Sequence, residues 1–137
     1  MSVDLRTTAE HIARQAYAPY SGYHVGAALR SASGHTYVGC NVENASFSVG
    51  SCAERAAIST AVAAEGSAFR LAAIAVVALN ALGESLPVTP CGACRQALVE
   101  FGDDAEVGFN GPGGVWQTVC AGELLPYRFV LPDTGPR

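Results

Sequence analysis

Three cysteines and one glutamate are the residues of this chain whose types and spacing best suit chemistry. Cys52 is followed two positions later by Glu54, and Cys91 and Cys94 lie far downstream in a Pro-Cys-Gly-Ala-Cys run. Three thiolates can hold a zinc ion and leave its fourth tetrahedral position free, which distinguishes catalytic zinc from the closed structural kind. Water fills such a position, and a carboxylate beside it that is not a ligand can move protons during hydrolysis. The four residues therefore predict metal-assisted hydrolysis.

The spacing also predicts how these side chains are presented. Positions three apart on a helix share a face, so Cys91 and Cys94 can reach one ion, whereas Cys52 and Glu54, two apart, point in different directions. If Cys52 also begins a helix, two helix N-termini face the thiolates and favour their deprotonated form. Arg55 is a candidate counter-charge to the resulting anionic site, although an arginine on a helix surface explains its position equally well.

The same residues allow other interpretations. Ser51 to Glu54 fits a capping box, in which the serine caps a helix and the glutamate reaches back. The Cys91 and Cys94 pair also resembles a dithiol redox site, but that interpretation gives no role to Cys52.

A structural zinc site is a further alternative, and it would need a fourth ligand. Cys40 and Cys120 are the remaining cysteines. Cys40 points with Val38 and Val42 toward the core, so we expect a buried free thiol, and we treat Cys120 alike. The histidines share no spacing and are expected to be structural: His11, His24 and His35.

The charge balance excludes several classes of protein. Twelve acidic and eight basic side chains give a net charge of -4, and the basic residues, all arginines, are scattered. No basic stripe follows a nucleic acid backbone, so we expect no nucleic acid partner. The chain has no lysine, which excludes a Walker phosphate loop and a pyridoxal Schiff base.

Length, cysteine usage and the apolar runs indicate the number of domains and the cellular location. The 137 residues, half of them apolar, suit a single domain spanning residues 1–137. Five cysteines, with an N-terminus that opens Met1-Ser2-Val3-Asp4 and lacks the build of a secretory signal, predict a cytoplasmic protein. The longest apolar run, Leu71 to Leu82, is too short for a membrane helix of about 20 residues, so no membrane partner is expected.

Periodicity predicts the first elements. An amphipathic helix begins the chain, with Thr7 and Glu10 as its candidate cap and with apolar residues at helical spacing: Leu5, Ala9, Ile12, Ala13 and Ala16. Two strand-like runs, His24 to Ser31 and Thr36 to Val42, flank a Ser-Gly turn and predict a hairpin. If the second strand persists, Asn41 and Glu43 project from the same face.

The later elements supply the rest of an α/β fold. Cys52 to Ala64 suits a buried helix, and Leu71 to Leu79 suits a strand covered on both faces. Thr89, as N-cap before Pro90, predicts a helix that ends at Gly102. Short strands and a final helical turn follow: Ala105 to Phe109, Val115 to Cys120 and Glu123 to Pro126. We expect a three-layer α/β/α architecture around a central, mostly parallel five-stranded mixed sheet.

Five blocks of the sequence resemble the zinc-dependent nucleoside deaminases, and most closely the short, homotetrameric cytidine deaminases. They occur in the family's order and cover residues 19–28, 39–46, 52–55, 90–96 and 123–126. The resemblance implies one Zn²⁺ per chain, held by Cys52, Cys91 and Cys94. It implies that Glu54 moves a proton from zinc-bound water to ring N3 and to the departing amine, while hydroxide attacks C4 of cytosine.

The resemblance also assigns residues to the substrate. Asn41 and Glu43 match the pair that grips the ribose hydroxyls, although a polar strand end is the simpler interpretation of the residues alone. Ala53 corresponds to a residue whose backbone N–H meets the pyrimidine carbonyl. Tyr23 stands where the family commonly has phenylalanine near the base, so its hydroxyl needs a partner unless it is simply a core aromatic. Tyr127 and Phe129 are both candidates for a C-terminal aromatic that reaches a neighbouring subunit's site.

These observations predict a cytidine and deoxycytidine deaminase of pyrimidine salvage. The resemblance further implies a homotetramer with active sites near the subunit interfaces and a small-molecule nucleoside as substrate. Two alternatives stay open: a deaminase of a modified cytosine nucleoside or nucleoside antibiotic, and a non-catalytic zinc-stabilised module.

Overall fold

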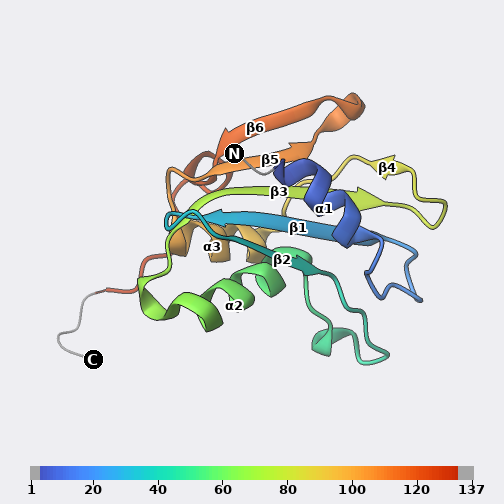
Figure 1. Ribbon diagram of the computed structural model, residues 1–137, viewed down its shortest axis with the longest axis horizontal. Helices are drawn as coiled ribbons and strands as arrows, with labels where there is room; N and C mark the ends of the chain where they lie inside the picture. Colours follow the sequence, from blue (N-terminus) through green and yellow to red (C-terminus); the bar gives the residue numbers. More distant parts are fainter. Residues whose placement is uncertain (1–3, 133–137) are drawn as a thin grey trace.

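A mixed β-sheet forms the middle layer of the structure, a computed structural model that describes residues 4–132 (Figure 1). Its strands run in the order β2-β1-β3-β5-β6, and the short β4 pairs with β3. The bounds are β1 His24–Ser31, β2 Thr36–Cys40, β3 Leu71–Leu79, β4 Ser85–Leu86, β5 Glu106–Asn110 and β6 Trp116–Cys120. Among these strands only β3 and β5 pair in parallel, so the expectation of a mostly parallel sheet was wrong. β1 and β2, and β5 and β6, are antiparallel neighbours that follow each other in the chain, and β1 also pairs antiparallel with β3 across the intervening β2 and α2.

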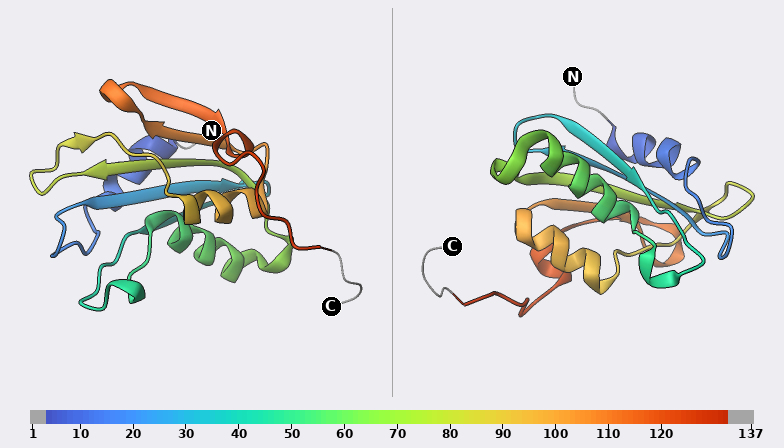
Figure 2. Two further views of the ribbon diagram at one scale, coloured as in Figure 1. Left: turned by 180° about the vertical axis from the view of Figure 1, so that it is seen from behind. Right: turned by 90° about the horizontal axis from the view of Figure 1, so that it is seen from below.

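Helices cover both faces of the sheet, which confirms the three-layer arrangement. Helix α1, Leu5–Ala13, packs on one face against β1 and β3. Helices α2, Ala53–Glu65, and α3, Gly92–Phe101, lie side by side on the other face (Figure 2). Short 3-10 helices follow or precede them in the connections: η1 Phe47–Val49, η2 Gly66–Ala68, η3 Pro112–Gly114 and η4 Ala121–Leu124.

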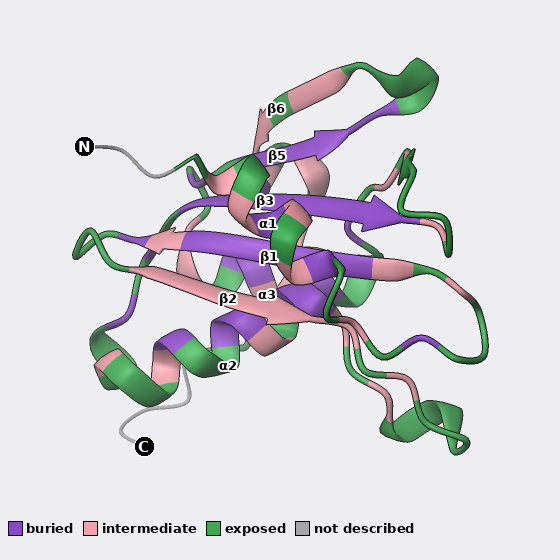
Figure 3. Cartoon of the chain, turned by 45° about the vertical axis from the view of Figure 1, so that its right-hand side comes forward, coloured by how far each residue is buried: buried purple, intermediate pink, exposed green. Residues whose placement is uncertain are grey.

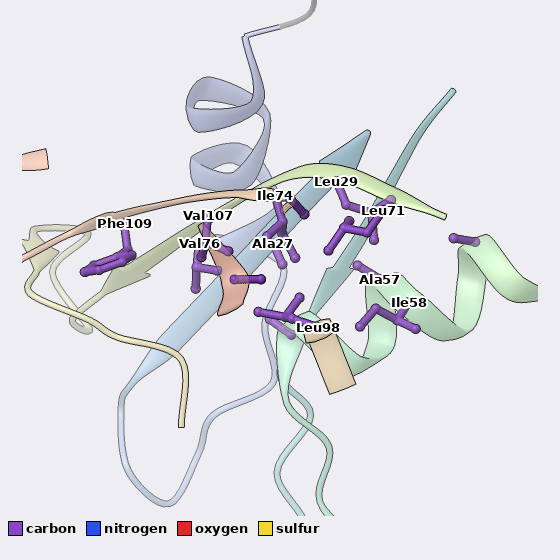
Figure 4. Packing of buried hydrophobic residues seen from close by; sticks show 14 of the residues in the cluster. Ala27, Leu29, Ala57, Ile58, Leu71, Ile74, Val76, Leu98, Val107 and Phe109 are labelled. Carbon is purple, nitrogen blue, oxygen red and sulfur yellow. The ribbon is translucent and has the colours of Figure 1, made fainter. Parts of the chain in front are cut away.

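The larger part of the core lies between the sheet and the α2 and α3 layer (Figure 4). Ile58 of α2 and Leu98 of α3 pack there with inward-facing residues of the strands, among them Leu29, Ile74 and Val76. A smaller cluster of mostly alanine and valine side chains joins α1 to the opposite face. Strand β3 is buried at every position except Ala72, as expected for a strand covered on both faces (Figure 3).

Two glycines allow the helices to approach the sheet closely. A Cβ at Gly39 of β2 would overlap the backbone of Ala53 and Ala57 in α2. A Cβ at Gly26 of β1 would overlap the backbone of Ala9 and Ala13 in α1. The positions of both helices therefore depend on the absence of a side chain at these points.

Several predicted boundaries were wrong for local reasons. Asp4 caps α1 through hydrogen bonds from the backbone N–H groups of Arg6 and Thr7, in place of the expected cap at Thr7 and Glu10. Strand β2 ends at Cys40, because the side chain of Asn41 turns back to bond the backbone of β1.

Helix α3 begins later than expected. Its N-cap is Cys91, whereas the sequence predicted a cap at Thr89 with Pro90 in the first helical position. Pro90 is instead a buried residue of the preceding extended segment. The residues Met1 to Val3, which entered the expectation about a secretory signal, lie outside the described part of the chain. Within residues 4–132, every helix is too short or too polar to cross a membrane.

Candidate metal centre and active site

The N-termini of two neighbouring helices bring the three predicted cysteines together. Cys52 is the N-cap of α2, Cys91 is the N-cap of α3, and Cys94 lies in the first turn of α3. Their Sγ atoms all lie within 4.8 Å of one another. Sulfur atoms around a tetrahedral zinc with bonds of about 2.3 Å are about 3.8 Å apart, so the three thiolates fit this ion. They are the only such group of metal-ligating side chains in residues 4–132.

The remaining cysteines and the histidines take no part in this cluster. Cys40 and Cys120 are free thiols outside it, as expected, so the alternative of a structural site with one of them as fourth ligand is not supported. Both are half-buried, whereas we expected Cys40 to be buried, because β2 is an edge strand with only part of that face covered. His24 Nδ1 lies 3.3 Å from the carbonyl oxygen of Ala16, and His35 Nδ1 lies 2.9 Å from Ser33 Oγ.

The electrostatics at the cluster differ between the two cysteines of α3. Backbone N–H groups at the start of the helix, first that of Cys94, lower the pKa of the Cys91 thiol. Burial raises the pKa of the Cys94 thiol, and the negative charge of Glu54 adds to this effect. Neutralising charge near the sulfur atoms is therefore needed before all three become thiolates, and a bound dication supplies it.

Arg55 lies against the cluster. Its Nη2 donates to Cys52 Sγ at 3.4 Å, and this contact is the main cause of a raised pKa of the guanidinium. The side chain is exposed, so it can contact the sulfur atom while remaining hydrated. The geometry places a permanent positive charge beside the anionic site.

Glu54 lies in the first turn of α2 and is only 5% exposed. Burial is the main cause of a raised pKa of its carboxyl group. Ser51 is not the N-cap of α2 and Cys52 makes no side-chain capping bond, so the capping-box interpretation was wrong. Glu54 is instead a carboxyl group held beside three thiols with little access to bulk water.

A cavity of about 620 Å³ opens over these groups. Its size falls within the usual range for small-molecule sites, about 300–1,000 Å³. Its lining includes two of the cysteines, Glu54 and Arg55, and all four residues assigned to the substrate by resemblance: Tyr23, Asn41, Glu43 and Ala53. Cys94 lies behind this surface and is completely buried.

Asn41 and Glu43 hold the loop that forms one wall of the cavity. Asn41 Oδ1 accepts from the backbone N–H of Val25 at 2.7 Å, and its Nδ2 donates to the carbonyl of Tyr23 at 2.8 Å. Glu43 accepts from the backbone N–H groups of Tyr20 and Ser21 at 3.0 and 3.1 Å, and also from the Ser21 hydroxyl. These bonds lower the pKa of the Glu43 carboxyl, first through the Ser21 side chain. Each side chain retains some hydrogen-bonding capacity toward the cavity.

The hydroxyl of Tyr23 has the partner that the sequence required. It donates to the carbonyl oxygen of Pro87 at 3.3 Å, and so connects one lining residue to the residue before Val88, which also lines the cavity. Burial is the main cause of a raised pKa of this hydroxyl, and the charge of Glu54 contributes.

Sequence reasoning did not identify Ser21, Val88 and Thr89 as residues that line the cavity. The only available signal for Ser21 was its place within the first block of resemblance.

Three cysteines on two helix N-termini, with a buried carboxyl group beside them in a cavity of an α/β/α fold, define a class of zinc-dependent hydrolases. The chain belongs to the cytidine and deoxycytidylate deaminase zinc-binding family, whose model, described as "Cytidine and deoxycytidylate deaminase zinc-binding region", matches residues 3–109. As in that family, the chain binds zinc through Cys52, Cys91 and Cys94.

Individual relatives agree with this membership. A cytidine deaminase of Sporosarcina psychrophila is 43% identical over 121 residues, which cover 87% of this chain and 84% of that protein. The crystal structure of cytidine deaminase from Burkholderia pseudomallei is similar with a TM-score of 0.78 and 43% identity, covering 91% of this chain and 96% of the other. The crystal structure of cytidine deaminase from Mycobacterium tuberculosis has a TM-score of 0.78 and 38% identity, covering 95% and 100%.

Proposed function

We propose that this chain catalyses the hydrolytic deamination of cytidine and deoxycytidine to uridine and deoxyuridine, with release of ammonia, in pyrimidine salvage. The observation that carries the proposal is the buried carboxyl group of Glu54 beside three clustered thiols at a nucleoside-sized cavity. Relatives described as cytidine deaminases share 38–43% of their residues with the chain over most of its length.

The roles of the residues follow from their chemistry. When bound, zinc acts as a Lewis acid that makes water a usable nucleophile near neutral pH. Glu54 takes a proton from the attacking water and delivers protons to ring N3 and to the leaving amine. Its raised pKa suits this role, because a group that titrates closer to neutral pH can both accept and return a proton. Arg55 offsets part of the charge of the three thiolates.

The remaining residues orient the substrate in this proposal. The backbone N–H of Ala53 faces the pyrimidine carbonyl, and Tyr23 packs beside the base. Asn41 and Glu43 bond the sugar hydroxyls with the capacity that their loop contacts leave free.

The oligomeric state and the cellular location are also proposals. We infer a homotetramer of single-domain chains with active sites near the interfaces, supported by exposed apolar side chains at the mouth of the cavity, among them Phe47 and Val42. Tyr127 and Phe129 are exposed on the C-terminal segment and both remain candidates for contact with a neighbour. A cytoplasmic location is supported by five free cysteines.

The experiment that tests the function combines metal analysis with an absorbance assay on cytidine. We expect one zinc per chain, conversion of cytidine and deoxycytidine to their uracil products, and loss of activity on zinc removal that zinc restores. Parallel assays on modified cytosine nucleosides test the alternative substrates. A zinc-loaded, folded protein that turns over none of these compounds would show that the module is not catalytic.

A further inference from the structure

The Glu123 to Pro126 block has no part in the chemistry described above, although it is one of the five blocks singled out in the sequence. It overlaps η4 and lies outside the lining of the cavity. A long-range hydrogen bond, donated by Arg95 to the carbonyl of Leu124, connects it to α3, the helix whose N-terminus holds Cys91 and Cys94.

Arg95 bridges two main-chain carbonyl groups from distant parts of the chain. Its Nε donates to the carbonyl of Pro90 at 2.8 Å, and its Nη1 donates to the carbonyl of Leu124 at 2.9 Å. The guanidinium is partly buried, and its rigid planar fork suits two acceptors at fixed positions. Hydrogen bonds from a charged donor contribute more than neutral ones.

The Pro90 carbonyl belongs to the peptide group that joins Pro90 to Cys91. Fixing this peptide plane fixes the direction from which the chain enters Cys91, a zinc ligand. The proline ring is buried, whereas Cys91 itself is exposed, so the Pro90 side of this peptide group is the side packed in the protein interior. The backbone N–H of Arg95 also donates to the Cys91 carbonyl at 2.9 Å, in the first turn of α3.

The other end of the bridge is firmly held. Ala121 is 1% exposed, and its N–H donates to the carbonyl of Ala105 at 2.9 Å. The side chain of Glu123 accepts from the backbone N–H of Cys120 at 3.3 Å, and Leu124 and Leu125 pack against the main core. Residues 121–125 therefore form a fixed support for the guanidinium.

We propose that Arg95 is a positioning residue that couples the 121–125 segment to Cys91 and thereby slows release of the metal. The inference rests on the zinc site of the proposed function, but not on the identity of the substrate. Side chains that orient metal ligands typically alter metal affinity by about 10–100-fold when they are removed.

The test measures zinc release from the loaded protein to a chromogenic chelator. We expect Arg95→Gln to release zinc about 10–100-fold faster than the parent chain. Arg70→Gln is the matched control, since Arg70 also donates to two main-chain carbonyls, those of Ser67 and Phe69, at 3.1 and 2.7 Å. Arg70 lies directly before β3, outside both the cavity lining and the group of metal-ligating cysteines. Release from Arg95→Gln at the parent rate would overturn the proposal.

Two further variants keep the test decisive if Arg95→Gln does not fold. Arg95→Lys keeps the charge but lacks the planar fork, so we expect intermediate release and an altered visible spectrum of the cobalt-substituted site. Glu123→Ala loosens the support itself, and we expect it to accelerate release less in Arg95→Lys than in the parent, because the two residues act through one path. Independent, additive effects would contradict the coupling.

Metal release is measured without substrate, so this test separates the two proposals. A parent chain that is inactive on cytidine but loses zinc faster in Arg95→Gln rejects the proposed function alone. An active parent with unchanged release in the Arg95 variants rejects the positioning role alone.

Discussion

Glu54 is a carboxyl group that α2 holds almost out of contact with solvent, beside the three thiols. We expect Glu54→Gln to keep the shape of the site while removing the group that accepts and returns protons. Cytidine turnover should fall by about 10²–10⁴-fold, the usual contribution of a general acid–base group, with zinc content and melting temperature retained. Glu100→Gln, at an exposed position of α3, is the control and should have full activity. Unchanged turnover in Glu54→Gln would place proton transfer elsewhere.

The residue types that hold zinc were predictable, because ligand chemistry is specific and cysteines three apart on a helix share a face. The contacts of Asn41 were not predictable in the same way. Its partners Val25 and Tyr23 lie 16 and 18 positions away in the chain, so only the folded loop brings them to the amide. The period of two placed Asn41 and Glu43 together on a strand, whereas the structure places them after the strand has ended.

At the scale of elements, the close approach of α2 to β2 sets where the catalytic helix lies. Gly39→Ala would force α2 away from the sheet, because the new methyl group overlaps the backbone of Ala53 and Ala57. We expect a loss of about 1–3 kcal/mol in the free energy of unfolding, together with reduced turnover by the folded fraction. Gly26→Ala displaces α1, which carries no site residue, and is the matched comparison. Denaturant unfolding and turnover per folded molecule check both, and equal turnover in the two variants would contradict the prediction.

The C-terminal end of α2 is tied to the β1–β2 hairpin by Glu65. This carboxylate accepts from the hydroxyls of Ser31, Ser33 and Tyr37 at 2.7–2.8 Å, and His35 Nδ1 lies 3.8 Å from it. These contacts, first the bond from Ser33, lower the pKa of Glu65 from its ordinary 4.5.

A pKa lowered by folding makes the contribution of Glu65 to stability depend on pH. The contribution is complete above the unfolded-state pKa and is lost as pH falls through the lowered folded-state pKa. We therefore expect Glu65→Gln to reduce the free energy of unfolding near neutral pH, with a difference from the parent that shrinks below about pH 4.5. Denaturant unfolding across this range measures the difference, with Glu100→Gln as the control. A constant difference at all pH values would show that Glu65 does not act through its charge.

Elements with a continuous apolar pattern were predictable to the residue, as β3 shows at Leu71 to Leu79. The start of α3 was not, because Pro90 is held outside the helix by burial and by Arg95, whose second partner lies in a segment 29 positions further along the chain. The two-residue β4 carries too little pattern to be detected. Sheet direction was also misjudged, because strand patterns alone do not encode the direction of pairing.

For the whole molecule, the proposed assembly predicts an effect at the mouth of the cavity. Phe47 is 80% exposed and its ring lies edge-on to Tyr20, with centroids 6.0 Å apart. We expect the parent chain, of 14.1 kDa, to have a mass of about 56 kDa by light scattering, and Phe47→Ser to shift it toward smaller species. Leu82→Ser changes a similarly exposed residue on a separate turn and should leave the mass unchanged. A monomeric parent would contradict the tetramer.

The bonds that Asn41 and Glu43 make to the 20–25 loop have a consequence for tolerance of the sugar. Strong rejection of an analogue arises when the missing hydroxyl leaves a buried protein group without a partner. Here Asn41 accepts from the backbone N–H of Val25 and donates to the carbonyl of Tyr23, and Glu43 accepts from backbone N–H groups, so both side chains have protein partners before any nucleoside arrives. If the two side chains bind the sugar as proposed, omitting a single hydroxyl from the pentose leaves neither of them without a partner, so we expect ribosides and deoxyribosides to bind with similar affinity.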